Sequence, residues 1–345
     1  MVLHLNYIGS KKTLFPLLDR VFRKYIKTTS VVADFFAGTG NVAMQIHKKY
    51  GCKVIANDVQ YYAYVINRAL LSKYSKTDVA LISKTKQEYQ SLRLVTGFFT
   101  RLYSPAGLRK RMYFTCSNAQ SIDAMRMALE KDRNTLPENV YYYLLADIIT
   151  SADKVANTSS VYASYLKAFK PTALKPLKLQ GFDSSFQCTT KNIILNDDVM
   201  NIAERQAKKC DVVYLDPPYN TRQYSTYYHV LDTIAKYDSP KVHGLTGVRD
   251  DVFKSSFSSK NEVEDAFADL FRKLAGCKTV IMSYNDEGIV SLDRMKQLLK
   301  ENHGGKIKVY KLPYKKFKAQ QGVERNILYE FIFVSCKTDA RRGKM

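Results

Sequence analysis

The chain has 345 residues, of which 46% are hydrophobic and 25% charged, as in soluble globular proteins. This composition excludes a disordered chain, a collagen-like chain and a disulfide-stapled miniprotein, and the length suits about two domains of roughly 150 residues each. No apolar run approaches the roughly 20 residues that cross a bilayer, and the first thirty residues lack the apolar segment of a secretory signal. We therefore expect an intracellular, cytoplasmic protein without membrane contact.

Basic residues outnumber acidic ones, with 54 Lys and Arg against 32 Asp and Glu, for a net charge of +22. The excess is spread over the chain, with +8 on residues 1–74 and +7 on each of the ranges 75–185 and 186–345. A globular body this basic is expected to bind a polyanion, most often nucleic acid. A surface charged for solubility, or one that faces an anionic membrane, is the alternative.

The residue types that bind metals or form disulfides are scattered. No two of the six cysteines lie within a dozen residues of each other, and the five histidines show no cluster. The spacing of zinc-ligand pairs is therefore missing. In a chain without a secretory signal, the cysteines are expected to be reduced and buried. We predict no metal site.

Short apolar runs alternate with helical patterns at both ends of the chain. Helical spacing of apolar residues predicts a helix over 13–27, followed by a strand over 31–36, a helix over 41–50 and a strand over 53–58. Strand patterns return at 192–195, 211–215, 279–283 and 327–334, with helices predicted between them at 226–237, 263–275 and 291–300. This order predicts an α/β fold with a doubly wound parallel sheet.

The alternation stops between about residues 75 and 185, where helical patterns dominate. We therefore predict two domains: a core formed by residues 1–74 and 186–345, and a mainly helical insertion formed by residues 75–185. A run of lysines between 306 and 318 either contacts phosphates or forms a solvated face.

The turn from Asp34 to Gly40 follows a strand and opens a helix, so its glycines let the backbone approach a ligand closely. Asp58 ends the next strand, 18 residues after Gly40, where a carboxylate can accept hydrogen bonds from the ribose hydroxyls of an adenosine. The phosphate-binding fingerprint with three glycines is missing, which favours a ligand without a pyrophosphate. The spacing alone does not separate NAD from S-adenosylmethionine, and a structural turn with a capping acid is the alternative.

The sequence Asp216-Pro217-Pro218-Tyr219 follows a predicted apolar strand and so lies at the edge where α/β sheets bind ligands. Because two prolines stiffen the loop, the Asp216 carboxylate and the Pro217 carbonyl can be held pointing in one direction. Two such acceptors on an exocyclic amine would direct the lone pair of its nitrogen toward a methyl donor. Tyr219 would stack on a base turned out of a duplex. An ordinary rigid turn is the alternative.

Three segments resemble, in the same order, the motifs of the Dam-like, D12 class of adenine-specific DNA methyltransferases: Asn6 to Lys11, Asp34 to Gly40 and Asp216 to Tyr219. The resemblance implies a Rossmann-like methyltransferase sheet with an inserted target-recognition domain, S-adenosylmethionine as cofactor, and methyl transfer to N6 of a flipped adenine in double-stranded DNA. It implies a cofactor site formed by Tyr7, Lys11, Asp34, Phe36, Gly38, Gly40, Asp58 and Asp216, and catalysis by Asp216, Pro217, Pro218 and Tyr219.

The resemblance also implies individual roles. Tyr7 and Lys11 would contact the methionine end of the cofactor, with Lys11 beside its carboxylate. Asp58 would hold the ribose, and Asp216 would reach both the cofactor and the target amine. One acid, Asp197 or Asp198, would lie with Tyr219 at the adenine pocket.

Residues 220–240 resemble more narrowly the subgroup with FokI-type and CATG-type modification methylases. This resemblance hints at a target sequence that contains ATG. It also implies a restriction–modification setting, in a bacterial cell or a virus-infected host cell. A cognate endonuclease would form no stable complex with the enzyme. In this class the insertion reads the target, although a purely structural helical cap is the alternative. The candidate DNA contacts beside the catalytic loop are Arg222, Gln223, Tyr224 and His229, although a lone histidine on an aromatic helix is as often structural.

Two other functions share these features. One is methylation of RNA, or of the N4 amine of cytosine, on the same fold; Asp rather than Ser at position 216 favours adenine by resemblance. The other is a non-catalytic DNA-binding protein that has kept the fold. The intact set of Lys11, Asp58 and Asp216 argues against this second alternative.

Overall fold

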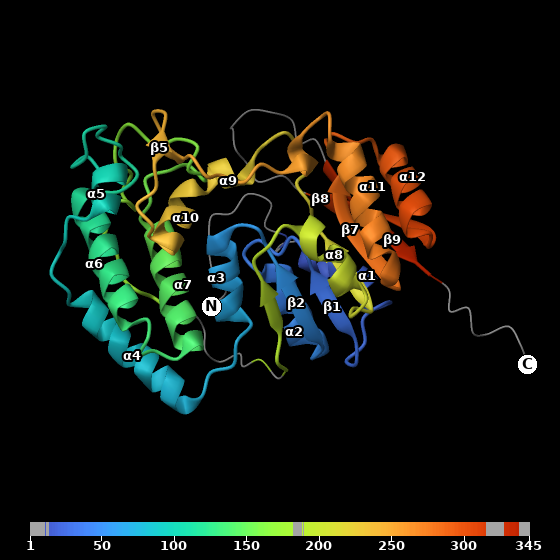
Figure 1. Ribbon diagram of the computed structural model, residues 1–345, viewed down its shortest axis with the longest axis horizontal. Coiled ribbons are helices and arrows are strands. Elements are labelled where there is room, and N and C mark those ends of the chain that lie inside the picture. Colours follow the sequence, from blue (N-terminus) through green and yellow to red (C-terminus); the bar gives the residue numbers. More distant parts are fainter. Residues whose placement is uncertain (1–10, 12–13, 182–187, 189, 315–327, 338–345) are drawn as a thin grey trace, which may run out of the picture.

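The computed structural model describes Lys11, residues 14–181, Cys188, residues 190–314 and residues 328–337. These residues form two bodies that lie side by side in Figure 1: a sheet covered by helices, and a body made of helices. The predicted α/β fold is confirmed. Tyr7 and the rest of its motif before Lys11 lie outside the described residues.

A sheet of seven strands forms the core of the first body, in the order β3-β2-β1-β4-β7-β9-β8. The strands are β1 (Val31–Asp34), β2 (Lys53–Asn57), β3 (Ile193–Leu195), β4 (Val212–Leu215), β7 (Thr279–Asn285), β8 (Lys306–Tyr314) and β9 (Leu328–Cys336). The first five in the sheet run parallel, and β9 is antiparallel to both of its neighbours. Runs rich in Val and Ile suit the parallel strands because both faces of such a sheet are covered.

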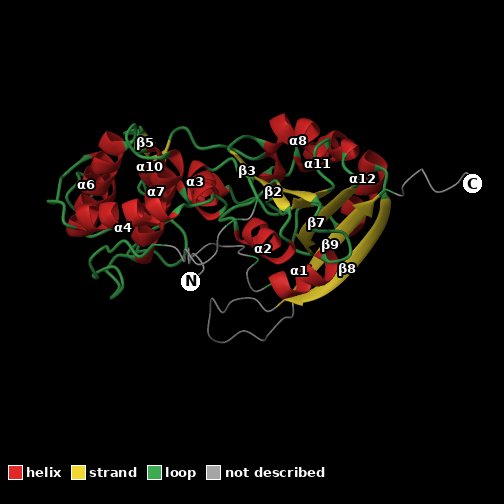
Figure 2. Cartoon of the chain, turned by 90° about the horizontal axis from the view of Figure 1, so that it is seen from below, coloured by secondary structure: helices red, strands yellow, loops and turns green. Residues whose placement is uncertain are grey.

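Helices cover both faces of the sheet. α1 (Phe15–Phe22) and α2 (Asn41–Tyr50) pack on one face, and α8 (Val199–Ala207), α11 (Val263–Lys273) and α12 (Leu292–His303) pack on the other, as Figure 2 shows. α2 occupies the predicted residues because Gly40 and Gly51 adopt the left-handed conformation at its two ends, with φ of 75° and 65°. The sheet is therefore doubly wound.

The second body is a bundle of helices: α3 (Tyr61–Leu70), α4 (Lys76–Gln90), α5 (Phe98–Tyr103), α6 (Cys116–Asp132), α7 (Glu138–Lys154) and α10 (His229–Lys236). Their apolar side chains form one buried cluster that is rich in tyrosine. Four of these helices belong to the predicted insertion, whereas α3 and α10 come from the segments on either side of it. The domain boundaries at residues 75 and 185 stay a prediction.

Some elements differ from the sequence-based expectations, which also omit α3. Residues 226–237 do not form one helix, because α9 (Tyr224–Tyr227) ends before α10 begins. The lysine-rich run at 306 forms the edge strand β8, where lysines discourage pairing with other chains; Lys315, Lys316 and Lys318 lie outside the described residues. A two-stranded hairpin, β5 (Val242–His243) and β6 (Val248–Arg249), follows α10.

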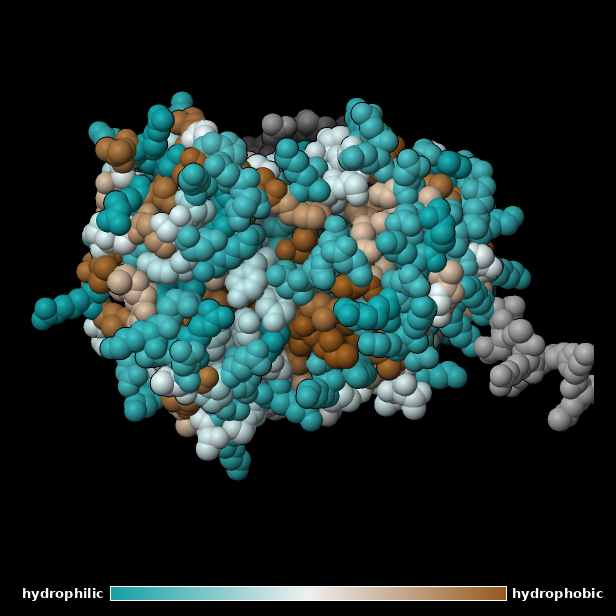
Figure 3. All heavy atoms as spheres, viewed as in Figure 1, coloured by the Kyte–Doolittle hydropathy of each residue, from teal (hydrophilic) through white to brown (hydrophobic). Residues whose placement is uncertain are grey.

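The surface carries mostly hydrophilic side chains on the face shown in Figure 3. None of the described helices is both long and apolar enough to span a membrane. Within the same residues, no group of three or more His, Cys, Asp or Glu side chains has the arrangement of a metal site.

Candidate active site

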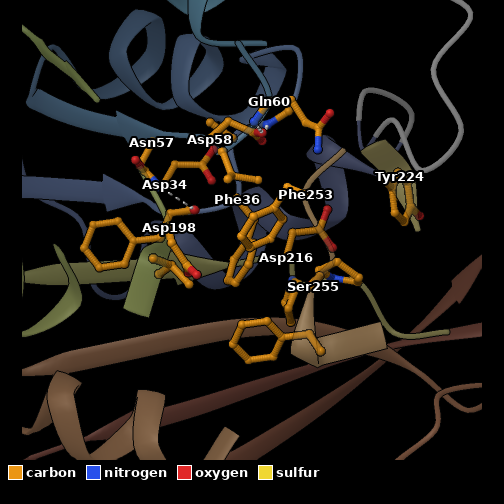
Figure 4. Close-up of a pocket in the computed structure, with 18 of the residues that line it drawn as sticks. Asp34, Phe36, Asn57, Asp58, Gln60, Asp198, Asp216, Tyr224, Phe253 and Ser255 are labelled. Carbon is orange, nitrogen blue, oxygen red and sulfur yellow. Dashed lines mark hydrogen bonds between the residues drawn. The ribbon is translucent and has the colours of Figure 1, made fainter. Parts of the chain in front are cut away.

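A cavity of about 310 Å³ opens at the carboxyl edge of the parallel strands. β1 lies between β2 and β4, so the strand order reverses at this point of the sheet. Ligands bind at such reversals in open α/β sheets because the loops that follow the two strands diverge there. The loops after β1, β2, β3 and β4 all line the cavity, which brings the glycine turn, Asp58 and the Asp216 loop together (Figure 4).

The glycine turn and Asp58 are held together by backbone groups. Gly38 N donates to Asp58 Oδ2 and Gln60 N donates to Asp58 Oδ1, each over 2.8 Å. Ala37 N donates to the Asn57 carbonyl oxygen over 3.0 Å. The turn after β1 and the end of β2 therefore form one unit, and its carboxylate lines the cavity.

Gly40 supports this turn without lining the cavity itself. Its φ is 75°, and a Cβ at this position would lie 2.6 Å from Asn67 Oδ1. Asn67 Nδ2 donates in turn to the Gly38 carbonyl oxygen over 2.8 Å. Among the described residues predicted to bind the cofactor, Gly40 is the only one absent from the cavity wall. Its contribution is to let α3 pack closely against the turn.

Five acids line the cavity, and burial raises the pKa of three of them: Asp34, Asp58 and Asp216. The pKa of Asp58 rises to about 6. The pKa of Asp34 lies well above its usual range, because the charges of Asp216 and Asp58 add to the effect of burial. Asp34 Oδ1 and Gln60 Oε1 are buried without a hydrogen-bond partner among the described residues. Because unpaired negative charge is costly here, the cavity favours a cationic ligand that donates hydrogen bonds.

One cation is built into the site. Lys11 Nζ lies 3.1 Å from Asp216 Oδ1 and 2.8 Å from Glu330 Oε1 on β9. Burial lowers the pKa of Lys11, but the charges of Asp216 and Glu330 outweigh this effect and hold the pKa well above its usual value. Lys11 therefore stays charged, and it opposes the rise that burial causes in the pKa of Asp216.

The catalytic loop presents two oxygen acceptors to the cavity. The Tyr219 carbonyl accepts a hydrogen bond from Ile289 N over 2.9 Å, which fixes the end of the loop. The Tyr219 ring packs edge-on against Tyr284, with ring centroids 6.4 Å apart. No backbone N–H of the described residues donates a hydrogen bond to the Pro217 carbonyl outside the helices and strands. Asp216 and Pro217 both line the cavity.

The chain after the Asp216–Tyr219 loop is bonded to residues 253–257, which form another part of the wall. Gln223 Nε2 donates to the Ser255 carbonyl over 3.3 Å, and Ser255 N donates to Gln223 Oε1 over 2.9 Å. Ser225 Oγ donates to the Phe253 carbonyl. The amide of Gln223, predicted to contact DNA, thus joins the two segments of the wall.

The other predicted DNA contacts lie in different surroundings. Tyr224 lines the cavity, and Arg222 is exposed. His229 is fully buried in the helical body, with Nε2 3.2 Å from the Tyr162 carbonyl oxygen, and burial lowers the pKa of His229 to about 4. The prediction that His229 contacts DNA is therefore corrected: its neutral ring packs inside the protein.

Both acids predicted for the adenine pocket line the cavity. Asp198 Oδ1 accepts from Met200 N over 2.9 Å and caps α8. Asp197 Oδ1 accepts from Asp198 N over 2.8 Å, and Asn57 Nδ2 donates to the Asp197 carbonyl over 3.0 Å. Since these bonds use Oδ1 of each acid, Oδ2 of each stays available to a ligand.

Sequence reasoning misses four parts of the site: Asn57, Gln60, residues 253–257 and Glu330. Asn57 and Gln60 flank Asp58, so their place follows once Asp58 is identified. Glu330 is the only charged residue between positions 328 and 336, and charged side chains in buried strands are usually paired. This pattern indicates that Glu330 has a charged or polar partner, but it does not identify the residue.

A family model described as D12 class N6 adenine-specific DNA methyltransferase matches residues 7–297. The chain belongs to this class of DNA methyltransferases. The predicted family, enzyme class and cofactor are thereby confirmed.

Relatives of this D12 methyltransferase are similar over nearly the whole chain. It is 34% identical to the type II methyltransferase M.NlaIII of Neisseria lactamica, covering 97% of this chain and 100% of that one. It is 35% identical to M.CviAII of Paramecium bursaria Chlorella virus 1, covering 95% and 97%. It is also 35% identical to M.FokI of Planomicrobium okeanokoites, covering 95% of this chain but only 52% of that longer protein.

The cavity of this D12 methyltransferase fits S-adenosylmethionine, the methyl donor of the class. That molecule carries a cationic sulfonium, a cationic ammonium and two ribose hydroxyls. The cavity offers matching acceptors: the unpartnered Asp34 Oδ1, the unpartnered Gln60 Oε1 and the carboxylate of Asp58. The charge and the hydrogen-bonding capacity of the wall therefore suit the cofactor.

Cofactor affinity should fall in mildly acidic solution, because Asp58 accepts hydrogen bonds best when ionised and its pKa is about 6. If only the ionised form binds, the Kd for S-adenosylmethionine at pH 5 should be about tenfold higher than at pH 8. Isothermal titration across this range measures the change. Asp58→Asn is the control and should bind more weakly with a flatter profile in this range, whereas a flat profile in the unaltered enzyme would contradict the role of Asp58.

Proposed function

We propose that this D12 methyltransferase transfers a methyl group to N6 of an adenine flipped out of a short specific duplex site, as the modification enzyme of a restriction–modification system. The observation that carries the proposal is the place of Asp216 and Pro217 in the wall of the cavity at the β1–β4 reversal, where the glycine turn and Asp58 also lie. Type II methyltransferases such as M.NlaIII and M.CviAII are relatives along nearly their whole length, which supports the setting.

S-adenosylmethionine supplies an electrophilic methyl carbon on its sulfonium. Asp216 and the Pro217 carbonyl accept the two hydrogens of the target amine, which draws electron density to the nitrogen and directs its lone pair toward that carbon. Fixed acceptors of this kind lower the barrier electrostatically, and the stiff loop supplies positioning. Bound S-adenosylmethionine would give up its methyl group to the amine nitrogen and leave as the neutral thioether, and Asp216 would hold the proton that the amine sheds.

The other residues of the site bind the cofactor or orient the reacting groups. Asp58 accepts hydrogen bonds from the ribose, and Asp34 faces the cationic part of the cofactor. Lys11 opposes the rise that burial causes in the pKa of Asp216 and so favours its ionised form. The face of Tyr219 stacks on the flipped adenine, because extruded bases are read between aromatic or apolar side chains.

DNA recognition falls to the helical body in this proposal. The insertion carries a net charge of +7, which suits contact with phosphates. A cognate endonuclease would act on the same short sequence, which the resemblance suggests contains ATG, and would need no stable complex with the methyltransferase.

Expression in a host without DNA methylation, followed by sequencing with detection of modified bases, tests the proposed function. We expect N6-methyladenine at one position of one short motif, and none with Asp216→Ala as the control. Tritium transfer from labelled cofactor to duplex DNA, single strands and RNA measures substrate preference. N4-methylcytosine as the product, or a preference for RNA, would overturn the proposal.

A further inference from the structure

Two leucines project from the helical body into solvent. Leu108 lies between α5 and α6 and is fully exposed, and Leu245 lies at the turn of the β5–β6 hairpin and is 74% exposed. In Figure 3, apolar side chains stand among hydrophilic ones at the top of the helical body, where Figure 1 labels β5. Single exposed leucines are common, so a function for this pair has to follow from how the protein holds them.

A buried arginine joins the two loops. The Arg111 guanidinium, only 4% exposed, donates to the carbonyl oxygens of Leu245 over 2.9 Å and Gly244 over 3.1 Å. Gly247 has a φ of 70°, and a Cβ there would lie 2.8 Å from Arg111 Cζ, so glycine is needed for this contact. The turn of the hairpin is therefore fixed to the loop that carries Leu108.

Further contacts fix the base of the hairpin. Arg249, 2% exposed, forms hydrogen bonds of 2.6 to 2.8 Å with the carboxylates of Asp238 and Asp251. Tyr103 Oη, at the end of α5, donates to the Gly247 carbonyl over 3.0 Å. A surface held in one geometry in this way loses little entropy when it binds a partner.

Exposed basic residues stand near both leucines in sequence, while the acids Asp238, Asp250 and Asp251 lie at the base of the hairpin, paired with Arg249 or His243. Arg109 and Lys110 follow Leu108 and are exposed, and Lys241 is exposed beside the hairpin. The described partners of Arg111 are carbonyl oxygens, so no carboxylate among them neutralises its charge. We call these residues the leucine tip: Leu108, Arg109, Lys110 and Leu245. Proteins that distort duplex DNA often insert an apolar side chain between the bases. Basic side chains around it then bind the neighbouring phosphates.

The leucine tip lies within reach of the active site along the DNA. Leu245 stands eight positions before Phe253, which lines the cavity, so the two residues are at most roughly 28 Å apart. One turn of B-DNA is longer, at about 34 Å. In Figure 1, β5 and α9 lie on the same side of the molecule, so a duplex bound over the cavity would have the tip within one helical turn of the cavity wall.

We propose that Leu245, supported by Leu108, inserts into the base stack of duplex DNA beside the target adenine and keeps the helix open while the adenine occupies the cavity. Arg109 and Lys110 bind the flanking phosphates. The inference rests on the proposed function, because it requires duplex DNA as the substrate. Leu245 would then be a DNA contact in the hairpin. The hairpin follows the Asp216–Tyr219 loop in sequence and lies outside the insertion.

The test compares Leu245→Ala with the unaltered enzyme on two duplexes that carry the site found by modification sequencing. One duplex is fully paired, and the other has an abasic position opposite the target adenine, so that the adenine is already unpaired. On the paired duplex we expect kcat/KM to fall about tenfold or more, since an apolar wedge offsets the cost of unstacking. On the abasic duplex we expect activity within about threefold of the unaltered enzyme, because that cost is smaller for an unpaired base.

Two control variants accompany this test. Val309→Ala removes another exposed apolar side chain that also neighbours a basic residue, but on strand β8 of the sheet, and should change neither activity. Leu245→Met keeps an apolar side chain and should retain most activity on the paired duplex. Cofactor affinity and melting temperature should be unchanged in all three variants.

Leu245→Ala with full activity on the paired duplex, or with equal losses on both duplexes, would overturn the inference. A change in sedimentation without a change in activity would also overturn it, because the tip would then be a contact between copies of the chain. Failure of the proposed function looks different, since the unaltered enzyme would then methylate neither duplex.

Discussion

Asp216→Asn should abolish methyl transfer, lowering kcat by roughly 10³-fold or more, because the change replaces an anionic acceptor by an amide at the point where the target amine binds. Loss of one preorganised group in an oxyanion hole costs about 10² to 10³ in rate, and here the group also receives a proton. Asn keeps the shape of the side chain, so the stiff loop and the Tyr219 contact with Tyr284 should persist.

Single-turnover measurements with saturating cofactor isolate this chemical step from binding and product release. Circular dichroism and cofactor titration accompany them, and we expect a folded protein whose affinity for S-adenosylmethionine changes less than about tenfold. A variant that retains more than a few per cent of the single-turnover rate would exclude Asp216 as the acceptor in the reaction.

Lys11→Met should destabilise the enzyme by about 3 to 5 kcal/mol at pH 8, the usual effect of removing one partner from a buried ion pair. The change leaves Asp216 and Glu330 next to each other without the ammonium that now lies 3.1 Å and 2.8 Å from them. Burial already raises the pKa of both carboxyl groups, and Lys11 opposes that rise. Removing Lys11 therefore raises both pKa values further.

The sign of the pH dependence follows from these shifts. A carboxyl group with a raised pKa in the folded state favours folding when protonated and loses that contribution as the pH rises through the raised pKa. The difference in unfolding free energy between Lys11→Met and the unaltered enzyme should therefore be larger at pH 8 than at pH 5, which urea unfolding at both values measures. Adding Glu330→Gln to Lys11→Met removes one of the two buried charges and should restore part of the stability at pH 8. Equal losses at both pH values would contradict this account of the ion pairs.

The parts of the molecule that were predictable depend on short stretches of chain. The strands of the parallel sheet appear as Val- and Ile-rich runs, and α2 is bounded by Gly40 and Gly51, whose left-handed conformations follow from the lack of a Cβ. The glycine turn and the Asp216 loop are each recognisable alone, because their chemistry depends on a few adjacent residues. Their meeting in one cavity follows from parallel strands, whose carboxyl ends share one edge of a sheet.

The parts that were not predictable depend on contacts between distant segments. Glu330 comes within reach of Lys11 only because β9 inserts between β7 and β8. Residues 253–257 become part of the wall through Gln223 and Ser225, and nothing in their own sequence indicates it. His229 stands near the catalytic loop in sequence, but α10 carries it into the helical body, where the tertiary fold decides its burial.

Because the buried cluster of the helical body includes side chains of α3 and α10, the inserted helices α4 to α7 are not an independent module. Grafting residues 75–185 from one methyltransferase onto another would pack the donor's helices against two helices of the recipient. A working chimera would have to exchange α3 and α10 as well. In sequence, α10 follows the Asp216 loop and α9, and it precedes the hairpin and residues 253–257 of the cavity wall. If these helices read the target, as we propose, a change of target site has to keep the packing of α4 to α7 against α3 and α10.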